Sequence, residues 1–272
     1  MTSTVPRDHW DAGDAYDRFM GRWSRLVARQ FVAWLAVAPG ADWLDVGCGT
    51  GTLLDAIQEA ANPRSLSGVD PSAGFLATAA KRLPPATDLR VGDARHLAYG
   101  AAIFDAVVAG LVLNFVPQPA SAIDEMRRVA RPGGTVGGYV WDYADGMGFL
   151  RHFWDAVIEL DPAAAGMDEG PRFPICRRDG LTDAFGRAGL AEVAGTALEI
   201  PTTFADFDDL WEPFLGGQGP GPAYVVALDE ERRAALRATL RARLPVEPDG
   251  SIHLTARAWA ARGTCATAAV TQ

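Results

Sequence analysis

Three glycines at alternate positions are the part of this sequence with the clearest chemical meaning. In the segment ADWLDVGCGTGTLL, residues 41–54, they come directly after Asp45 and directly before a helical pattern. A strand that enters a helix through glycines presents backbone N–H groups with no Cβ in the way, so a ligand can approach the backbone closely. The stretch therefore predicts a ligand-binding turn at Gly47, Gly49 and Gly51.

Two classes of ligand use a turn of this kind. The dinucleotide fingerprint G-x-G-x-x-G seats a pyrophosphate on a helix N-terminus, but here Gly51 comes one residue early and position 52 is Thr. The pattern D-x-G-x-G-x-G at residues 45–51 instead resembles motif I of the class I S-adenosylmethionine (SAM)-dependent methyltransferases. The resemblance implies that SAM is the cofactor, that Gly47, Cys48, Gly49 and Gly51 line it, and that Asp45 suits its ammonium group.

Acidic residues follow the next two strand-like segments. SLSGVDPS carries Asp70, and VGDARHL carries Asp93. A carboxylate at the end of the second strand can accept both ribose hydroxyls, as it does in dinucleotide folds, so Asp70 alone does not separate the two cofactors. In the methyltransferase family the position of Asp93 and its neighbour contacts the adenine amino group. The resemblance thus adds cofactor contacts at Asp70, Pro71, Ser72, Asp93 and Ala94.

A fourth motif keeps the same order along the chain. FDAVVAGLVLNFVPQP, followed by MRRVARPGGTVGGYVW, is similar to motif IV of the family and the strand after it. The resemblance covers about residues 41–143 and places Gly110 and Leu111 at the cofactor. The amino-methylating nucleic-acid enzymes have a carboxamide–proline pair in this motif, and this sequence does not. No metal set of catechol methyltransferases and no paired-glutamate loop of arginine methyltransferases is found either, so the chain is similar to the small-molecule ubiquinone/menaquinone and natural-product group.

The elements that must position these residues alternate between strand-like and helix-like segments. Such alternation argues for an α/β fold with a parallel sheet and helices on both faces. The resemblance makes this a Rossmann-like sheet of seven strands, mostly parallel, with the last strand antiparallel and supplied by residues 250–263. We predict one domain over residues 1–272, with its SAM-binding core at 41–143.

Three further segments flank this core. Residues 14–40 hold an amphipathic helix that ends at Pro39-Gly40, and family likeness suggests a lid over the cofactor that includes Tyr16, Arg22 and Trp23. Plain core packing is the alternative for Trp23 and for Tyr16. Residues 144–180 and 201–250 interrupt the alternation, and each is too short to build its own core. We interpret both as cap insertions that form the acceptor pocket.

The acceptor is expected to be a small apolar or aromatic molecule, because the interruptions are rich in aromatic residues. About half of these aromatic residues are expected to be cap core only. Methyl transfer needs a general base only when a hydroxyl or a carbon acid is methylated. Tyr143 and His152 are the candidates for that role, although His152 also fits a surface or cap position. The pocket candidates are Asn114, Phe149, Trp154, Trp211, Phe214 and Tyr224.

Composition limits the partners. The net charge of −9 and the pI near 4.9 argue against nucleic acid. Three separated cysteines fit a reducing cytoplasm, and neither they nor the four histidines have metal-ligand spacing. No apolar run approaches a membrane span. Homodimer formation is possible on this composition, and an Arg-rich chain with one lysine suggests a bacterial source.

Three other functions compete with methyl transfer. They are a non-methylating reaction on the same SAM fold (decarboxylation, cyclisation or hydroxylation), a nicotinamide oxidoreductase, and a non-enzymatic SAM-binding protein.

Overall fold

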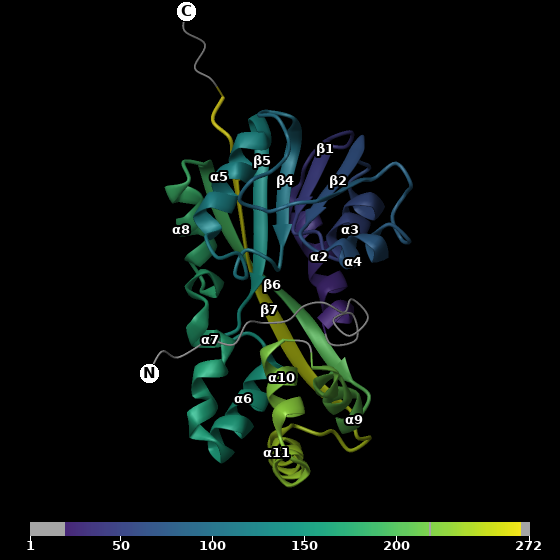
Figure 1. Cartoon of the computed structure of the whole chain (residues 1–272), viewed down its shortest axis with the longest axis vertical. Helices are drawn as coiled ribbons and strands as arrows, with labels where there is room; N and C mark the ends of the chain where they lie inside the picture. The colour runs from purple at the N-terminus through teal and green to yellow at the C-terminus, as the bar shows by residue number, and fades with distance from the viewer. Residues whose placement is uncertain (1–19, 218, 268–272) are drawn as a thin grey trace, which may run out of the picture. The chain divides into compact units, whose positions relative to one another are not determined.

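A seven-stranded sheet organises the chain (Figure 1). The computed structural model describes residues 20–217 and 219–267. Neighbouring strands follow the order β3-β2-β1-β4-β5-β7-β6. Their bounds are β1 Asp42–Val46, β2 Ser65–Asp70, β3 Asp88–Val91, β4 Phe104–Gly110, β5 Ala130–Trp141, β6 Ala191–Phe204 and β7 Ile252–Thr264.

Strand direction in the sheet agrees with the sequence prediction. The pairs β1–β2, β1–β4, β2–β3 and β4–β5 are parallel, whereas β5 and β7 are antiparallel. Between β6 and β7, Thr264 Oγ1 donates to the Ala191 carbonyl at 3.3 Å, and Thr203 Oγ1 lies 3.3 Å from His253 Nδ1. The early end of β6 thus meets the late end of β7. The predicted Rossmann-like fold with an antiparallel last strand is confirmed.

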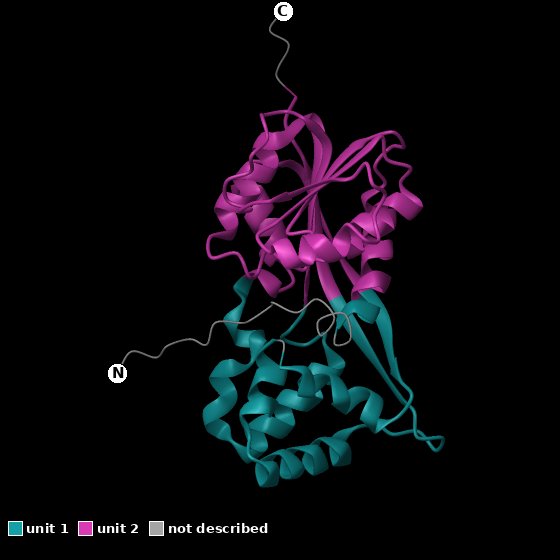
Figure 2. Cartoon of the chain, turned by 45° about the vertical axis from the view of Figure 1, so that its right-hand side comes forward, with its two compact units in different colours: residues 1–23, 142–174, 199–257 teal, residues 24–141, 175–198, 258–272 magenta. Residues whose placement is uncertain are grey.

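The chain groups into two compact units (Figure 2). Unit 1 comprises residues 1–23, 142–174 and 199–257, and unit 2 comprises residues 24–141, 175–198 and 258–272. The division falls inside β6 and inside β7. Most of both predicted insertions belongs to unit 1, and nearly all of the predicted SAM-binding core belongs to unit 2. The single-domain interpretation itself stays a prediction.

Helices cover both faces of the sheet in unit 2. A Cβ built on Gly137 of β5 would lie 2.8 Å from Leu35 of α2, whereas one built on Gly138 would lie 3.6 Å from Phe185 of α8. Successive strand residues point to opposite faces, so α2 and α8 pack on opposite sides of β5. The helices assigned wholly or mainly to this unit are α2 Arg22–Leu35, α3 Thr52–Ala60, α4 Ala73–Ala79, α5 Pro119–Val129 and α8 Gly180–Arg187.

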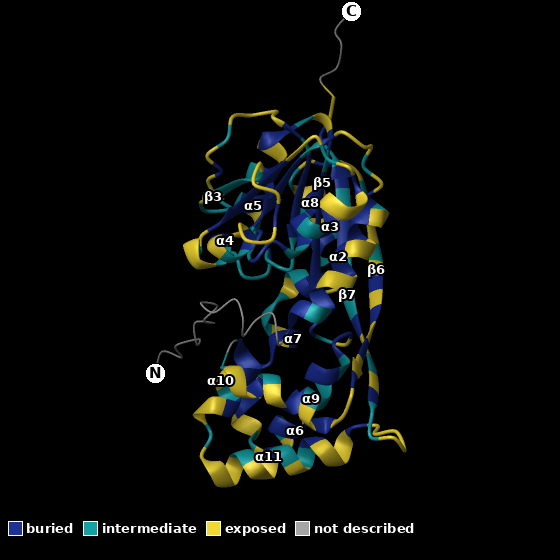
Figure 3. Cartoon of the chain, turned by 90° about the vertical axis from the view of Figure 1, so that its right-hand side faces the viewer, coloured by how far each residue is buried: buried dark blue, intermediate teal, exposed yellow. Residues whose placement is uncertain are grey.

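Unit 1 is mainly helical around an aromatic core. Phe153 and Phe214 are fully buried and stack with ring centroids 4.4 Å apart. Figure 3 shows buried residues on the inner sides of its helices and a long exposed side on α11. Its α-helices are α6 Gly148–Leu160, α7 Glu169–Arg172, α9 Phe207–Trp211, α10 Pro220–Ala227 and α11 Glu230–Arg243, and its 3-10 helices include η2 Pro162–Met167 and η4 Glu212–Gly216.

The segment 144–180, interpreted from the sequence only as an interruption of the alternation, contains the helix α6. The buried side chains of Phe149, Phe153, Trp154 and Val157 recur at helical spacing. Glycines before the helix and prolines after it concealed this periodicity. Since α6 carries the stacked Phe153, it supplies the centre of the unit 1 core.

Candidate functional site

The glycine turn joins β1 to α3 with a left-handed backbone. Gly47, Gly49 and Gly51 have φ values of +76°, +52° and +89°, a region that side chains other than glycine rarely adopt. A Cβ on Gly47 would lie 2.5 Å from a Val112 methyl group. A Cβ on Gly49 would meet nothing within 4 Å in the described part of the chain. The turn is therefore packed at Gly47 and open at Gly49.

Asp70 fixes the turn from the end of β2. Its Oδ2 accepts the Gly49 N–H at 2.9 Å, and its Oδ1 accepts the Ser72 N–H at 2.8 Å. Ser72 in turn caps α4 by accepting the Phe75 N–H at 3.2 Å. The Asp70 side chain is almost fully buried, and this burial raises its pKa, while the two backbone hydrogen bonds oppose the rise. Each carboxylate oxygen keeps a second lone pair for a ligand hydroxyl.

Asp45 lies deeper, on β1. Its residue is 1% exposed, and its Oδ1 has no hydrogen-bond partner among the described residues. Burial raises its pKa first, and the nearby negative charge of Asp70 adds to the rise. A buried carboxylate oxygen without a donor is costly unless something supplies one. The geometry thus suits a cation with N–H donors.

Asp93 follows β3 and is held by its own loop. Arg95 donates to both carboxylate oxygens, with Nη2 at 2.6 Å from Oδ2 and Nε at 3.0 Å from Oδ1. The Arg95 backbone N–H adds a bond of 2.9 Å. These bonds lower the pKa of Asp93 to about 2. The carboxylate is therefore ionised and oriented, and Ala94 is fixed between the two paired residues.

The loop after β4 lies against the glycine turn through Val112. Leu111 has φ +59°, which is unusual for a residue with a branched side chain, and its N–H donates to the Tyr139 carbonyl at 2.8 Å. Both polar atoms of the Asn114 side chain are buried without a hydrogen-bond partner in the part of the chain that the structure describes. A strained backbone and an unsatisfied amide at one strand end are typical of a binding site.

Comparison with known families identifies the domain that contains the glycine turn. Residues 44–137 match the model of the methyltransferase domain. Residues 44–137 form a methyltransferase domain, similar to those of the class I SAM-dependent methyltransferases. This match confirms the resemblance drawn from the glycine turn, Asp70, Asp93 and the motif after β4, all of which lie inside the matched range.

Relatives of the methyltransferase domain are similar over the same part of the chain. A demethylmenaquinone methyltransferase of Symbiobacterium thermophilum is 38% identical over 130 residues, which cover 44% of this chain and 51% of the relative. A phosphatidylethanolamine N-methyltransferase of Cereibacter sphaeroides is 36% identical over 126 residues, covering 44% and 60%. The chain thus spans only about half to three fifths of these two curated relatives.

Solved structures extend the likeness of the fold beyond the methyltransferase domain. A solved structure from Anabaena variabilis, named as a putative methyltransferase from an antibiotic biosynthesis pathway, has a TM-score of 0.62 with this chain. The two chains are 16% identical, and the alignment covers 87% of this chain and 98% of the other. At this identity the likeness concerns the fold alone.

Among the described residues, the predicted lid residue Trp23 and the predicted bases Tyr143 and His152 lie outside residues 44–137 and in unit 1. Tyr16 falls outside the described residues. Trp23 is buried, and its ring meets Phe204 edge-on at 5.4 Å, which agrees with its alternative as a core residue. Tyr143 is buried with its ring 5.9 Å from Phe173. His152 lies on α6, where burial lowers its pKa. The catalytic roles of Tyr143 and His152 stay predictions.

The aromatic pocket candidates also lie in unit 1. They form one packed cluster, in which Phe149 meets Phe214 at 6.5 Å and Trp211 meets Phe214 at 6.3 Å. Trp154 is fully buried, and Tyr224 reaches it at 6.3 Å. Packing explains the burial of this cluster without a ligand, so its role in acceptor binding remains a prediction.

Glu169 is a buried acid that the sequence reasoning missed. It is 4% exposed, and its Oε2 accepts the Trp154 Nε1–H at 2.6 Å. Burial raises its pKa to about 7. The adjacent Asp168 is instead paired with Arg151. Two acidic residues followed by Gly170 and Pro171 are typical of a surface turn. The local sequence therefore gives no sign that Glu169 is buried.

Within residues 20–217 and 219–267, no group of His, Cys, Asp and Glu side chains could hold a metal ion. In the same ranges, no helix is long and apolar enough to cross a membrane.

Proposed function

We propose that this chain transfers a methyl group from SAM to a small molecule with an apolar body. The observation that carries the proposal is the pair of buried carboxylates beside the glycine turn. Asp45 and Asp70 are both largely desolvated, and each pKa is raised by burial. A ligand that brings positive charge to this position would relieve both.

The residues present fit SAM. Asp45 would accept from its ammonium group, and its Oδ1 has no other donor among the described residues. Asp70 would accept from the ribose hydroxyls while it keeps Gly49 and Ser72 in place. The open side of Gly49 would let the methionine part approach the backbone. Ionised Asp93 would accept from the adenine amino group.

When bound, SAM supplies an electrophilic methyl group on a sulfonium. Because the charge of the sulfonium is lost in the transfer, the chain's main task is to align the acceptor. Asn114 would do so, since its amide offers both a donor and an acceptor at the end of β4. The strained Leu111 backbone would hold this loop in one arrangement.

The class of acceptor is supported by two relatives. Their names give demethylmenaquinone and phosphatidylethanolamine as the molecules they methylate. Both molecules join a large apolar part to a polar reacting group. We propose the same class here, with the methylated atom left among O, N and C. The acidic pI favours such a molecule over nucleic acid, and a cytoplasmic location is proposed on the three buried free cysteines.

Isothermal titration of the full chain with SAM tests the donor site. Micromolar binding is expected, with Asp70→Asn weakening it and Asp124→Asn, an exposed α5 residue, leaving it unchanged. Incubation with SAM and either demethylmenaquinone or phosphatidylethanolamine vesicles should then release S-adenosylhomocysteine. Absence of SAM binding would refute the proposal, whereas binding without product from either acceptor would refute only the acceptor class.

A further inference from the structure

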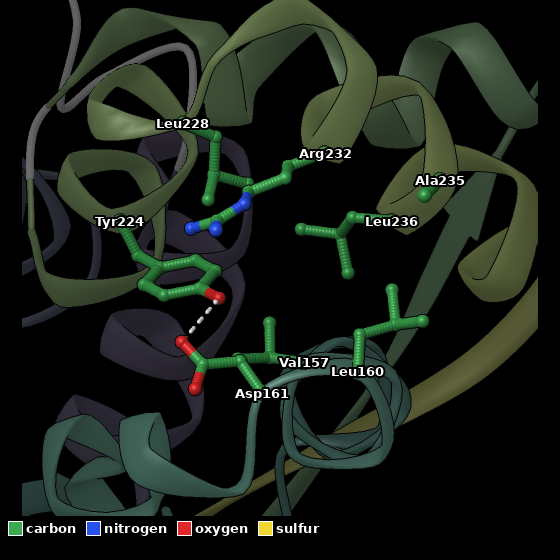
Figure 4. A pocket seen from close by; sticks show the side chains of 8 residues that line it. All are labelled: Val157, Leu160, Asp161, Tyr224, Leu228, Arg232, Ala235 and Leu236. Atoms are coloured by element: carbon green, nitrogen blue, oxygen red, sulfur yellow. Dashed lines mark hydrogen bonds between the residues drawn. The ribbon is translucent and has the colours of Figure 1, made fainter.

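A pocket lies within unit 1, apart from the residues assigned to SAM (Figure 4). It has a volume of about 310 Å³ and is formed by the end of α6, by α10 with the residue after it, and by α11. This volume is at the lower end of the range for small-molecule sites. The lining residues are Val157, Leu160, Asp161, Tyr224, Leu228, Arg232, Ala235 and Leu236.

One side of the pocket is apolar. Five of the eight lining residues are aliphatic. Val157 and Leu236 are buried, whereas Leu160 is 47% exposed. Figure 4 shows Leu160, Ala235 and Leu236 gathered on the side away from Tyr224. An exposed aliphatic wall of this kind would gain stability by covering an apolar molecule.

The other side of the pocket is polar. Asp161 accepts the Tyr224 hydroxyl at 3.1 Å and the Ala163 N–H at 3.2 Å, so both of its oxygens are engaged. Burial and the bond to Asp161 raise the pKa of Tyr224, which therefore keeps its proton. The Tyr224 hydroxyl thus already donates its proton to Asp161, and each Asp161 oxygen already accepts one hydrogen bond.

Arg232 is the one cation among the eight lining residues. Its guanidinium lies in the pocket near Tyr224 (Figure 4). Its nearest ion pair is a long one, with Nε 3.7 Å from Asp229 Oδ2, and its side chain is 76% exposed. A guanidinium presents several N–H donors in a plane that matches a carboxylate.

We propose that this pocket binds an apolar molecule with a single carboxylate, of the kind represented by a medium-chain fatty acid. The carboxylate pairs with Arg232, and the hydrocarbon covers Val157, Leu160 and Leu236. An amine in the place of the carboxylate would face the like charge of the Arg232 guanidinium. The proposal goes beyond methyl transfer and does not depend on it, because all lining residues belong to unit 1.

Isothermal titration of the full chain with decanoate, without SAM and below the micelle concentration, tests the proposal. We expect saturable 1:1 binding that weakens about fourfold for each methylene removed in octanoate and hexanoate. Decan-1-ol and decylamine should bind on the order of tenfold more weakly than decanoate. No binding of decanoate, or equal binding of decan-1-ol, would overturn the proposal.

Variants connect the binding to the pocket. Arg232→Gln should weaken decanoate binding on the order of tenfold. Arg237→Gln is the matched control, because it removes the same charge from the same helix while Arg237 faces Asp208 and Phe207. Leu160→Glu changes an exposed side chain and should abolish binding by placing a carboxylate in the pocket. Equal effects of the two arginine variants, or decanoate binding to a folded Leu160→Glu protein, would show that the pocket is not the site.

Discussion

The carboxylate of Asp70 accepts the backbone N–H of Gly49 across 2.9 Å. The bond ties the end of β2 to the centre of the glycine turn, and the second oxygen ties the same carboxylate to the start of α4. One acidic side chain thus orders two loops before any ligand arrives. Four consequences of this site and one of the buried acid in unit 1 can be measured.

Replacing Asp70 tests the order that it imposes. Asp70→Asn keeps the shape of the side chain but removes the charge, and its amide nitrogen cannot accept from Gly49 or Ser72. We expect SAM affinity to fall on the order of tenfold to a hundredfold. Titration calorimetry measures this, with Asp124→Asn as the control for charge. An unchanged affinity would show that Asp70 serves only the fold.

Two alanine variants separate packing from ligand access in the turn. Gly47→Ala meets Val112 and adopts an unfavourable φ, so we expect it to lower the free energy of unfolding by about 3 kcal/mol. Gly49→Ala has the φ cost alone, about 1 kcal/mol, but should weaken SAM binding because its methyl group occupies the open side. Urea unfolding and titration of both variants give the comparison. Equal losses of stability in Gly47→Ala and Gly49→Ala would contradict the assignment of Gly47 to packing and Gly49 to ligand access.

Binding of SAM should release protons. The pKa of Asp45 is raised in the free protein by burial and by Asp70, and a bound ammonium would lower it. Affinity should therefore rise with pH over the range in which the free protein still holds the proton. Calorimetry in buffers of different ionisation enthalpy counts the released protons. Asp45→Asn should bind weakly and without this pH dependence.

Removing the unsatisfied amide should stabilise the chain and impair its function. In Asn114→Leu the buried donor and acceptor disappear, so we expect the free energy of unfolding to rise by about 1 kcal/mol. SAM affinity should stay the same, while release of S-adenosylhomocysteine with an acceptor should fall. Thermal unfolding and a product assay measure the two effects. A destabilised variant would indicate that Asn114 has a structural partner.

Glu169 makes stability depend on pH. Its pKa is about 7 in the folded chain against an ordinary value of 4.5. The folded state thus holds the proton more tightly, so the stabilisation is complete below pH 4.5, declines as pH rises, and is lost above pH 7. The loss amounts to about 3 kcal/mol at most. Urea unfolding of Glu169→Gln, which can still accept from Trp154, should show a flatter profile between pH 5 and 8. A profile equal to that of the unchanged chain would disprove this assignment.

The sequence predicts the methyltransferase domain well because its signals are local. The glycine turn, Asp70 and Asp93 each follow a strand, and the common edge of parallel strands brings them together. The hydrogen bonding of these groups is predictable only where the partner is close in sequence. The pairing of Asp93 with Arg95, two residues further on, can be expected from the sequence. The sequence does not predict that the Asn114 amide has no hydrogen-bond partner among the described residues.

Unit 1 is harder to predict because its parts are far apart in the chain. Its core joins Phe153 to Phe214, and its acid Glu169 takes its donor from Trp154. The helical spacing of α6 is a local signal that a stricter periodicity count would have found. The grouping of residues 142–174 with residues 199–257 depends on packing, which sequence patterns do not encode.

The place of β7 between β5 and β6 has a consequence for synthesis. The ribosome delivers β7 after all the strands that it joins, and β6 neighbours no other strand of the sheet. Until residues 252–264 emerge, both β5 and β6 offer unpaired backbone edges to other chains. The nascent protein therefore passes through an aggregation-prone stage that lasts until β7 has been synthesised and has paired with both strands.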